Sequence, residues 1–250
     1  MESDIFYDCR WSYECDDRFI DDFNFIQDKV FSGVHSRELF KKQYIYNIYG
    51  DSVLVVVYHK NQPIAARSLW RNDILGQVAY QNCRAAVLKQ YRGQGIFTKM
   101  TKIVGDFLPT KALIYSFPNQ YSFQGYKKQG WYNVGQYYPS LFCTKDFIKE
   151  HPVRIDNEYF KWWILGNNSM KYIKKYGCYF LVRKTARTFC YKVVALIDAS
   201  IARMLPKAPL LAIYIYNSSI KKIYNNNSLP LRPVSNQELS FLPLWKIDAV

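Results

Sequence analysis

The stretch VLKQYRGQGIFTKM, residues 87–100, places two glycines one residue apart between an apolar run and a helical pattern. The whole chain has only 11 glycines in 250 residues, so Gly93 and Gly95 do not belong to a generally glycine-rich segment. A strand, a glycine turn and a helix N-terminus together present free backbone N–H groups and the positive end of the helix dipole to an anion. Side chains on such a turn would block close approach. The stretch therefore predicts a phosphate-binding loop.

The spacing of this loop excludes two familiar phosphate-binding motifs. No Gly-Lys-Ser/Thr follows Gly93, so the loop is not a P-loop. The dinucleotide fingerprint needs a third glycine and an opening βαβ unit, and both are missing. Taken alone, the glycine pair fits a tight turn without a ligand equally well.

A second group of polar residues follows the next predicted strand, in FPNQYSFQGYKKQGW. Asn119 and Tyr126 are seven residues apart, about two helical turns, on a predicted helix that ends near Gly130. Both side chains can therefore face one cleft. Asn119 also suits the N-cap of this helix, and most of the 22 tyrosines are expected to serve packing.

Together the two stretches resemble the signature of the GNAT superfamily of N-acetyltransferases. That signature pairs Gln/Arg-x-x-Gly-x-Gly/Ala with a later Asn, Tyr and Gly-aromatic helix, and Gln90, Gly93 and Gly95 fill its first part. The resemblance covers roughly residues 52–138. It implies an α/β (α+β) fold with a mixed, mostly antiparallel central sheet flanked by helices. We expect a catalytic domain in residues 1–145 and a second, degenerate GNAT-like half in residues 146–250.

The resemblance also implies a role for each matching position, with acetyl-coenzyme A as the acyl donor. The backbone of the loop would hold the pyrophosphate. The end of the preceding strand would pair with the pantetheine arm and direct an N–H group toward the thioester carbonyl. Asn119 would form a hydrogen bond with the pantetheine arm. Tyr126 would be the catalytic residue that protonates the leaving thiolate. The strand AYQNCRAAV lacks the Glu that many relatives use as a base, so a water chain is expected instead. The expected cofactor-binding residues are Ala86, Val87, Arg92, Gly93, Gln94, Gly95, Ile96, Phe97 and Asn119.

The identity of the acceptor amine depends on a narrower resemblance. The whole pattern is most similar to family members associated with bacterial surface-polysaccharide biosynthesis, which implies an amino sugar carried on a nucleotide or lipid diphosphate. Two alternatives stay open: an aminoacyl-tRNA-dependent peptidyltransferase, and a non-enzymatic binder of nucleic acid or a membrane surface. The intact glycine loop counts against the peptidyltransferase.

Composition and charge are consistent with a soluble chain that binds phosphate-bearing ligands. Apolar residues make up 49 % and aromatic residues 18 %, and the acidic start MESDIFYDCR is unlike a secretory signal, so we expect a cytoplasmic protein. Six scattered cysteines and three histidines favour reduced thiols and no metal site. Residues 1–150 hold 19 Lys and Arg against 15 Asp and Glu, and residues 151–250 hold 15 against 5, so most of the +14 net charge lies in the second part.

Hydrophobic periodicity predicts the elements that position the two motifs. In the first part we expect helices over 14–31, 36–44, 95–108 and 121–129, a hairpin over 52–70, and strands over 78–88, 112–117 and 131–138. In the second part CYFLVRK, CYKVVALIDA and PLLAIYIY predict strands, and SIARMLPK and SSIKKIYNNN predict helices. This order partly repeats the first, without a second glycine loop.

Overall fold

The architecture comes from a computed structural model, which describes residues 4–31, 33, 35–74, 76–109, 112–136, 138–141, 154–175, 177–184, 190–209, 212–217 and 232–239. The chain divides into two compact units, Met1–Tyr132 with Val234–Leu239, and Asn133–Pro233 with Ser240–Val250. The expected boundary between residues 145 and 146 falls within 142–153, which lie outside the described residues.

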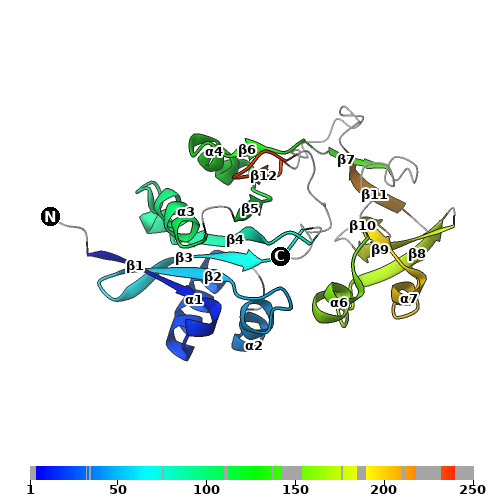
Figure 1. Ribbon diagram of the computed structural model, residues 1–250, viewed down its shortest axis with the longest axis horizontal. Helices are drawn as coiled ribbons and strands as arrows, with labels where there is room; N and C mark the ends of the chain where they lie inside the picture. The colour runs from blue at the N-terminus through cyan, green and yellow to red at the C-terminus, as the bar shows by residue number, and fades with distance from the viewer. Residues whose placement is uncertain are drawn as a thin grey trace. The chain divides into compact units, whose positions relative to one another are not determined.

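A seven-stranded sheet forms the centre of the first unit, in the order β1-β2-β3-β4-β5-β12-β6 (Figure 1). Its first four strands are antiparallel neighbours, β5 runs parallel to β4, and β12 runs antiparallel to β5. This confirms the mixed, mostly antiparallel sheet. The strands are β1 (Ile5–Trp11), β2 (Val53–His59), β3 (Gln62–Arg71), β4 (Ala79–Val87), β5 (Leu113–Ser116), β6 (Tyr132–Asn133) and β12 (Val234–Ser235).

Helices cover both faces of this sheet, with α1 and α2 on one face and α3 and α4 on the other (Figure 1). α1 begins where the Asp16 carboxylate accepts a hydrogen bond from the Phe19 N–H at 2.8 Å, a side-chain cap. On the other face, β2 and α3 bury a shared core that includes Val55 and Met100. The helices are α1 (Asp17–Val30), α2 (Arg37–Phe40) continued by a π-helical turn (Lys41–Ile45), α3 (Ile96–Asp106) and α4 (Gln120–Lys128).

Strand β4 carries a bulge in its second half. Ala86 lies opposite Ala66, but Cys83 lies opposite Ser68, so β4 has one more residue than β3 between these pairs. Arg84, at the bulge, has φ +52°, a left-handed conformation that a residue with a Cβ adopts at a cost in strain. Beyond the bulge, β4 has no paired residue on β5, because their ladder ends at Gln81 opposite Tyr115. The four-residue β5 therefore pairs only with the start of β4.

The sequence predicted most elements of this unit to within a few residues, but it did not predict β1 or β12 and it misplaced one strand. Strand β1 was not predicted; only one of its faces meets the core, and its residues are mostly half-buried rather than strictly alternating. The strand expected over 131–138 was wrong, because β6 covers only Tyr132–Asn133, while Tyr138–Leu141 forms β7 in a different sheet. A segment from the far end of the sequence, β12, takes the place beside β5, and the N–H of Asn236, the residue after β12, donates to the Ile114 carbonyl at 3.0 Å.

The second unit is built on a five-stranded sheet in the order β7-β11-β10-β9-β8. β8, β9 and β10 are antiparallel neighbours, and β10 runs parallel to β11. The three predicted strands are confirmed, and the predicted helix SIARMLPK is shorter than expected; SSIKKIYNNN lies outside the described residues. The elements are β8 (Met170–Lys175), β9 (Cys178–Lys184), β10 (Cys190–Ile197), β11 (Ala212–Asn217), α6 (Asn157–Tyr159) with a π-helical turn (Phe160–Ile164), and α7 (Ala199–Ala202). Among the described residues, no helix is long and apolar enough to cross a bilayer.

Candidate functional site

The loop between β4 and α3 has the backbone geometry of an anion cradle. Gly93 and Gly95 have φ +79° and +76°, the left-handed conformation that glycine adopts without strain, and Gly95 is the N-cap of α3. The first helical bond is donated by the Lys99 N–H to the Gly95 carbonyl at 3.0 Å. Within the described part of the chain, no N–H group of residues 93–98 has an acceptor. A Cβ at either glycine would meet no atom within 4 Å, so the space beside these N–H groups is open.

The side chains of the loop face outward or stabilise it. The Arg92 Nε donates to the Val87 carbonyl at 3.0 Å, and the Gln94 side chain donates to the Gln90 carbonyl at 3.4 Å. Ile96 is the exception, since it is buried in the core between α3 and the sheet. The backbone of this loop and its exposed side chains, among them Arg92 and Gln94, are therefore available to an anion.

The end of β4 offers an unpaired edge next to the loop. The Leu88 N–H donates to the Ile64 carbonyl at 3.0 Å, and hydrogen-bonded positions alternate along an antiparallel pair, so the N–H of Val87 faces away from β3. On that side β5 no longer pairs with β4. Ala86, one residue earlier, is buried and hydrogen-bonds toward β3. The Val87 N–H is therefore available to a ligand that binds between β4 and β5.

Asn82 lies where β4 and β5 separate, and its side chain has no partner. The residue is 3 % exposed, and neither its Oδ1 nor its Nδ2 has a hydrogen-bond partner. Its carbonyl accepts from the Ser116 hydroxyl at 2.9 Å, so the backbone here is satisfied while the amide is not. A buried amide without partners is costly unless a ligand or water satisfies it. No pattern in the sequence indicated Asn82 as a site residue.

Helix α4 carries the second sequence motif, with Asn119 at its N-cap and Tyr126 two turns later. The Asn119 Oδ1 accepts hydrogen bonds from the N–H groups of Tyr121 and Ser122 at 3.1 and 3.0 Å, so Asn119 is the N-cap. Its Nδ2 has no partner among the described residues and is free to donate. Tyr126, two turns later, is 2 % exposed and packs against Trp131, with the ring centroids 4.6 Å apart.

Phe97 and Tyr126 meet below the glycine loop. Their rings contact edge to face, with centroids 5.6 Å apart, and a Cβ at Gly125 would come within 3.0 Å of the Phe97 ring. The bulky side chain of Phe97 thus points toward α4 and leaves only its N–H near the anion cradle. The structure joins the two sequence motifs at this ring contact.

An arginine completes the cluster and was not found from the sequence. Arg67, in the middle of β3, is fully buried, and its Nη2 donates to the Tyr126 hydroxyl oxygen at 3.2 Å. The guanidinium lies 4.2 Å from the centre of the Phe97 ring. Burial lowers the pKa of Arg67, and nearby Tyr126 and Cys83 oppose this shift. A charged residue inside the apolar run PIAARSLW was the one signal that the sequence carried.

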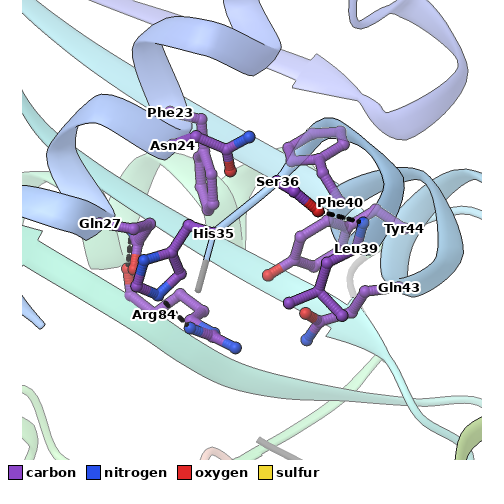
Figure 2. A pocket seen from close by; sticks show the side chains of 10 residues that line it. All are labelled: Phe23, Asn24, Gln27, His35, Ser36, Leu39, Phe40, Gln43, Tyr44 and Arg84. Carbon is purple, nitrogen blue, oxygen red and sulfur yellow. Dashed lines mark hydrogen bonds between the residues drawn. The ribbon is translucent and has the colours of Figure 1, made fainter. Parts of the chain in front are cut away.

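On the opposite face, a hollow lies between α1, α2 and the β4 bulge (Figure 2). The Gln27 Nε2 donates to the Arg84 carbonyl at 3.0 Å, but the Gln27 Oε1 and the Gln43 Nε2 are buried without partners. Aromatic rings of α1, α2 and the following turn form its wall. The lining residues are Phe23, Asn24, Gln27, His35, Ser36, Leu39, Phe40, Gln43, Tyr44 and Arg84.

A charged chain runs along one side of this hollow. The Arg84 Nη1 lies 2.8 Å from the His35 Nε2, and the His35 Nδ1 lies 2.7 Å from the Asp28 carboxylate. Because a guanidinium only donates, His35 accepts at Nε2 and carries its proton on Nδ1, toward Asp28. The Nη2 and Nε of Arg84 make no hydrogen bond among the described residues and stay free to bind a ligand. Among the described residues, no group of three or more His, Cys, Asp or Glu could hold a metal ion.

Comparisons with known proteins identify solved structures that share this fold. No family model matches the chain, and no curated protein matches its sequence. Among solved structures, a GCN5-related N-acetyltransferase from Kribbella flavida is 11 % identical, with a TM-score of 0.55, over 92 % of this chain and 71 % of that one. A probable N-acyltransferase from Enterococcus faecalis is 13 % identical, with a TM-score of 0.56, over 92 % and 72 %. A putative acetyltransferase from Pyrococcus horikoshii is 10 % identical, with a TM-score of 0.54, over 96 % and 92 %.

These three similarities extend over more than nine-tenths of the chain, although the sequences have diverged widely. At such identities they establish the fold and leave the chemistry to the site. The predicted fold class is confirmed: the chain has a mixed α/β fold with a mostly antiparallel central sheet flanked by helices, and this fold matches that of the acetyltransferase structures.

Proposed function

We propose that the protein is an N-acyltransferase that moves an acetyl or other short acyl group from acyl-coenzyme A to a primary amine. The observation that carries the proposal is the open cradle of unpaired N–H groups at residues 93–98, which adjoins the unpaired end of β4. A pyrophosphate would bind at the cradle and at the positive end of the α3 dipole. The amide-bearing pantetheine arm would then run between β4 and β5, where the Asn82 side chain has no partner, and would reach the free Nδ2 of Asn119 at the start of α4.

The chemistry follows from the positions of two groups. The Val87 N–H donates to the thioester carbonyl oxygen and stabilises the negative charge that develops there when the amine attacks, an effect worth about 2.7–4 kcal/mol in other acyl-transfer sites. When the carbon–sulfur bond breaks, the hydroxyl of Tyr126 gives its proton to the thiolate. Tyr126 is buried beside Phe97, so this transfer takes place away from bulk water.

For the acceptor we propose an amino sugar of surface-polysaccharide biosynthesis, carried on a nucleotide or lipid diphosphate. The hollow between α1, α2 and the β4 bulge supports this choice, because it combines an aromatic wall, unpaired amide atoms and a free cationic donor on Arg84. These groups suit sugar hydroxyls and a phosphoryl oxygen. We further propose that the basic residues 151–250 belong to a degenerate acyltransferase-like half of the chain, and that the enzyme acts in the cytoplasm.

The first prediction concerns the cradle. Gly95→Asp adds a carboxylate and a strained backbone where the pyrophosphate would sit, so we expect at least a hundredfold loss of acetyl-coenzyme A affinity, measured by calorimetric titration. Gly76→Asp is the matched control, since Gly76 has almost the same φ, +77°, and equally open space, in another loop. Unchanged affinity in a folded Gly95→Asp variant contradicts the proposed site.

The second prediction concerns Tyr126. Tyr126→Phe keeps the ring packing and removes the proton donor, so we expect acetyl-coenzyme A affinity within about threefold of the parent and a turnover about 10²–10⁴-fold lower. Thiol release from acetyl-coenzyme A, with and without an amine, measures this. Tyr115→Phe, another buried tyrosine, with its hydroxyl bonded to the Asn72 carbonyl, is the control. Equal turnover by Tyr126→Phe and the parent would leave Tyr126 as packing alone.

The third prediction concerns the hollow. Arg84→Met removes a charged donor, so we expect the KM for a UDP-linked amino sugar to rise at least tenfold, because a hydrogen bond to a charged group contributes about 1.5–3 kcal/mol. Affinity for acetyl-coenzyme A should stay within about threefold. Arg18→Met, an exposed cation on α1 outside the hollow, should change neither value. If KM is unchanged in Arg84→Met, the acceptor binds elsewhere.

The fourth prediction separates the transferase from a nucleic-acid binder, which the +14 net charge also favours. A protein that contacts several phosphates of a duplex loses about 10³–10⁵ in affinity between roughly 50 and 200 mM salt, whereas a diphosphate sugar with fewer charges loses far less. We expect weak, salt-sensitive binding to DNA and RNA duplexes and amino-sugar acetylation that persists at about 150 mM salt. Tight duplex binding at that salt, with no acyl transfer, supports the binder.

A further inference from the structure

Arg67 is a buried cation without a counter-ion. It is fully buried inside β3, and none of the described carboxylates forms an ion pair with it. Its Nε has no hydrogen-bond partner. Replacing such a residue with an apolar one of similar volume often stabilises a protein, so packing gives no reason for a guanidinium at this position.

Arg67 forms hydrogen bonds with Tyr126 on α4 and with two residues of α3. Besides the 3.2 Å bond from Nη2 to the phenol oxygen, Nη1 donates to the Thr101 hydroxyl and, at 3.4 Å, to the Phe97 carbonyl. The Thr101 hydroxyl in turn donates to the same Phe97 carbonyl at 2.8 Å. The first turns of α3 therefore fix the guanidinium in position, and the guanidinium faces α4.

This arrangement excludes Arg67 as the acceptor of the phenol proton. A guanidinium carries only donors, so the Tyr126 oxygen accepts from Arg67 and its own proton must point elsewhere. No described residue accepts that proton, since the bond from Arg67 is the one hydrogen bond that Tyr126 makes through its hydroxyl. The O–H group of Tyr126 therefore has no acceptor among the described residues and can donate to a ligand.

We propose that Arg67 is a positioning residue for Tyr126: it orients the phenol proton toward the thioester sulfur and stabilises the phenolate formed after the proton has left. This inference rests on the proposed function of the site. In the step, the amine nitrogen forms its bond to the carbonyl carbon, the carbon–sulfur bond breaks, and its electron pair leaves on the sulfur. The phenol proton goes to the sulfur to give the free thiol. The proton that the amine loses passes to water, and solvent returns a proton to the phenolate.

The charges around the pair suit this role. Arginine stays protonated in proteins, so the cation persists through the cycle even though burial lowers its pKa. The other ionisable group that faces Arg67 is Cys83 on β4, and burial raises the pKa of this thiol, which keeps it neutral. The surroundings are apolar, so a new negative charge on the phenol would be strongly stabilised by one cation beside it.

The test compares variants of the full chain in two measurements, acetyl-coenzyme A affinity by titration and thiol release from acetyl-coenzyme A with or without a UDP-linked amino sugar. For Arg67→Met we expect affinity within about threefold of the parent and turnover about 10–100-fold lower. Arg67→Lys should recover part of the turnover, because it restores the charge without the planar fork. Arg71→Met, on the same strand but paired with Asp73 at 2.5 Å, is the matched control and should keep the parent turnover.

A double-mutant cycle separates positioning from packing. If Arg67 acts through Tyr126, Tyr126→Phe combined with Arg67→Met is no slower than Tyr126→Phe alone, within about threefold. Independent losses that multiply, or parent turnover in Arg67→Met, overturn the proposal. Thr101→Val, which removes one anchor of the guanidinium and keeps the shape, should lower turnover severalfold at unchanged affinity and serves if Arg67→Met does not fold. Failure of the parent to bind acetyl-coenzyme A would contradict the proposed function instead.

Discussion

The bulge in β4 is the constraint on which the candidate site depends. It inserts one residue opposite β3 and bends the strand, as bulges do, and β4 continues for six residues beyond its last pair with β5. The separation frees the Val87 N–H and leaves the Asn82 amide without partners, while the same bulge turns Arg84 toward α1 and α2. β5 is only four residues long and ends at Ser116, so the last residues of β4 have no strand beside them on that side.

Two opposite faces of the sheet thereby gain different chemistry from one backbone irregularity. On the α3 face lie the glycine loop and the cluster of Arg67, Phe97 and Tyr126, which suit an anionic, amide-bearing donor. On the α1 face lies the hollow with Arg84 and His35, which suits a polar acceptor. Because β4 lies between the two, a group held at its free edge would be within reach of both faces.

The sequence predicted the parts of this site that depend on neighbours along the chain. The glycine turn, the capped start of α4 and the strand–helix order follow from local propensity and periodicity, so they could be read directly. Arg67 could not, because its partners Thr101 and Tyr126 lie 34 and 59 residues away. The same holds for β12, which reaches the sheet from residues 234–235, and for the bulge, which becomes visible only once β3 and β4 are in register.

The unsatisfied polar atoms of the first unit have a pattern that packing alone does not produce. Folded proteins pair nearly all buried polar groups, and each one left unpaired costs about 1–3 kcal/mol. Within the described residues of this unit, Gln27, Gln43, Arg67 and Asn82 hold such atoms, and they come from the two faces around β3 and β4. Gln27 and Asn82 contact the bulge region directly or adjoin it in sequence. Ser68, Tyr44 and Tyr115 nearby are satisfied, so the unpaired atoms lie where the proposed donor and acceptor would bind, and a ligand or water there would supply their partners.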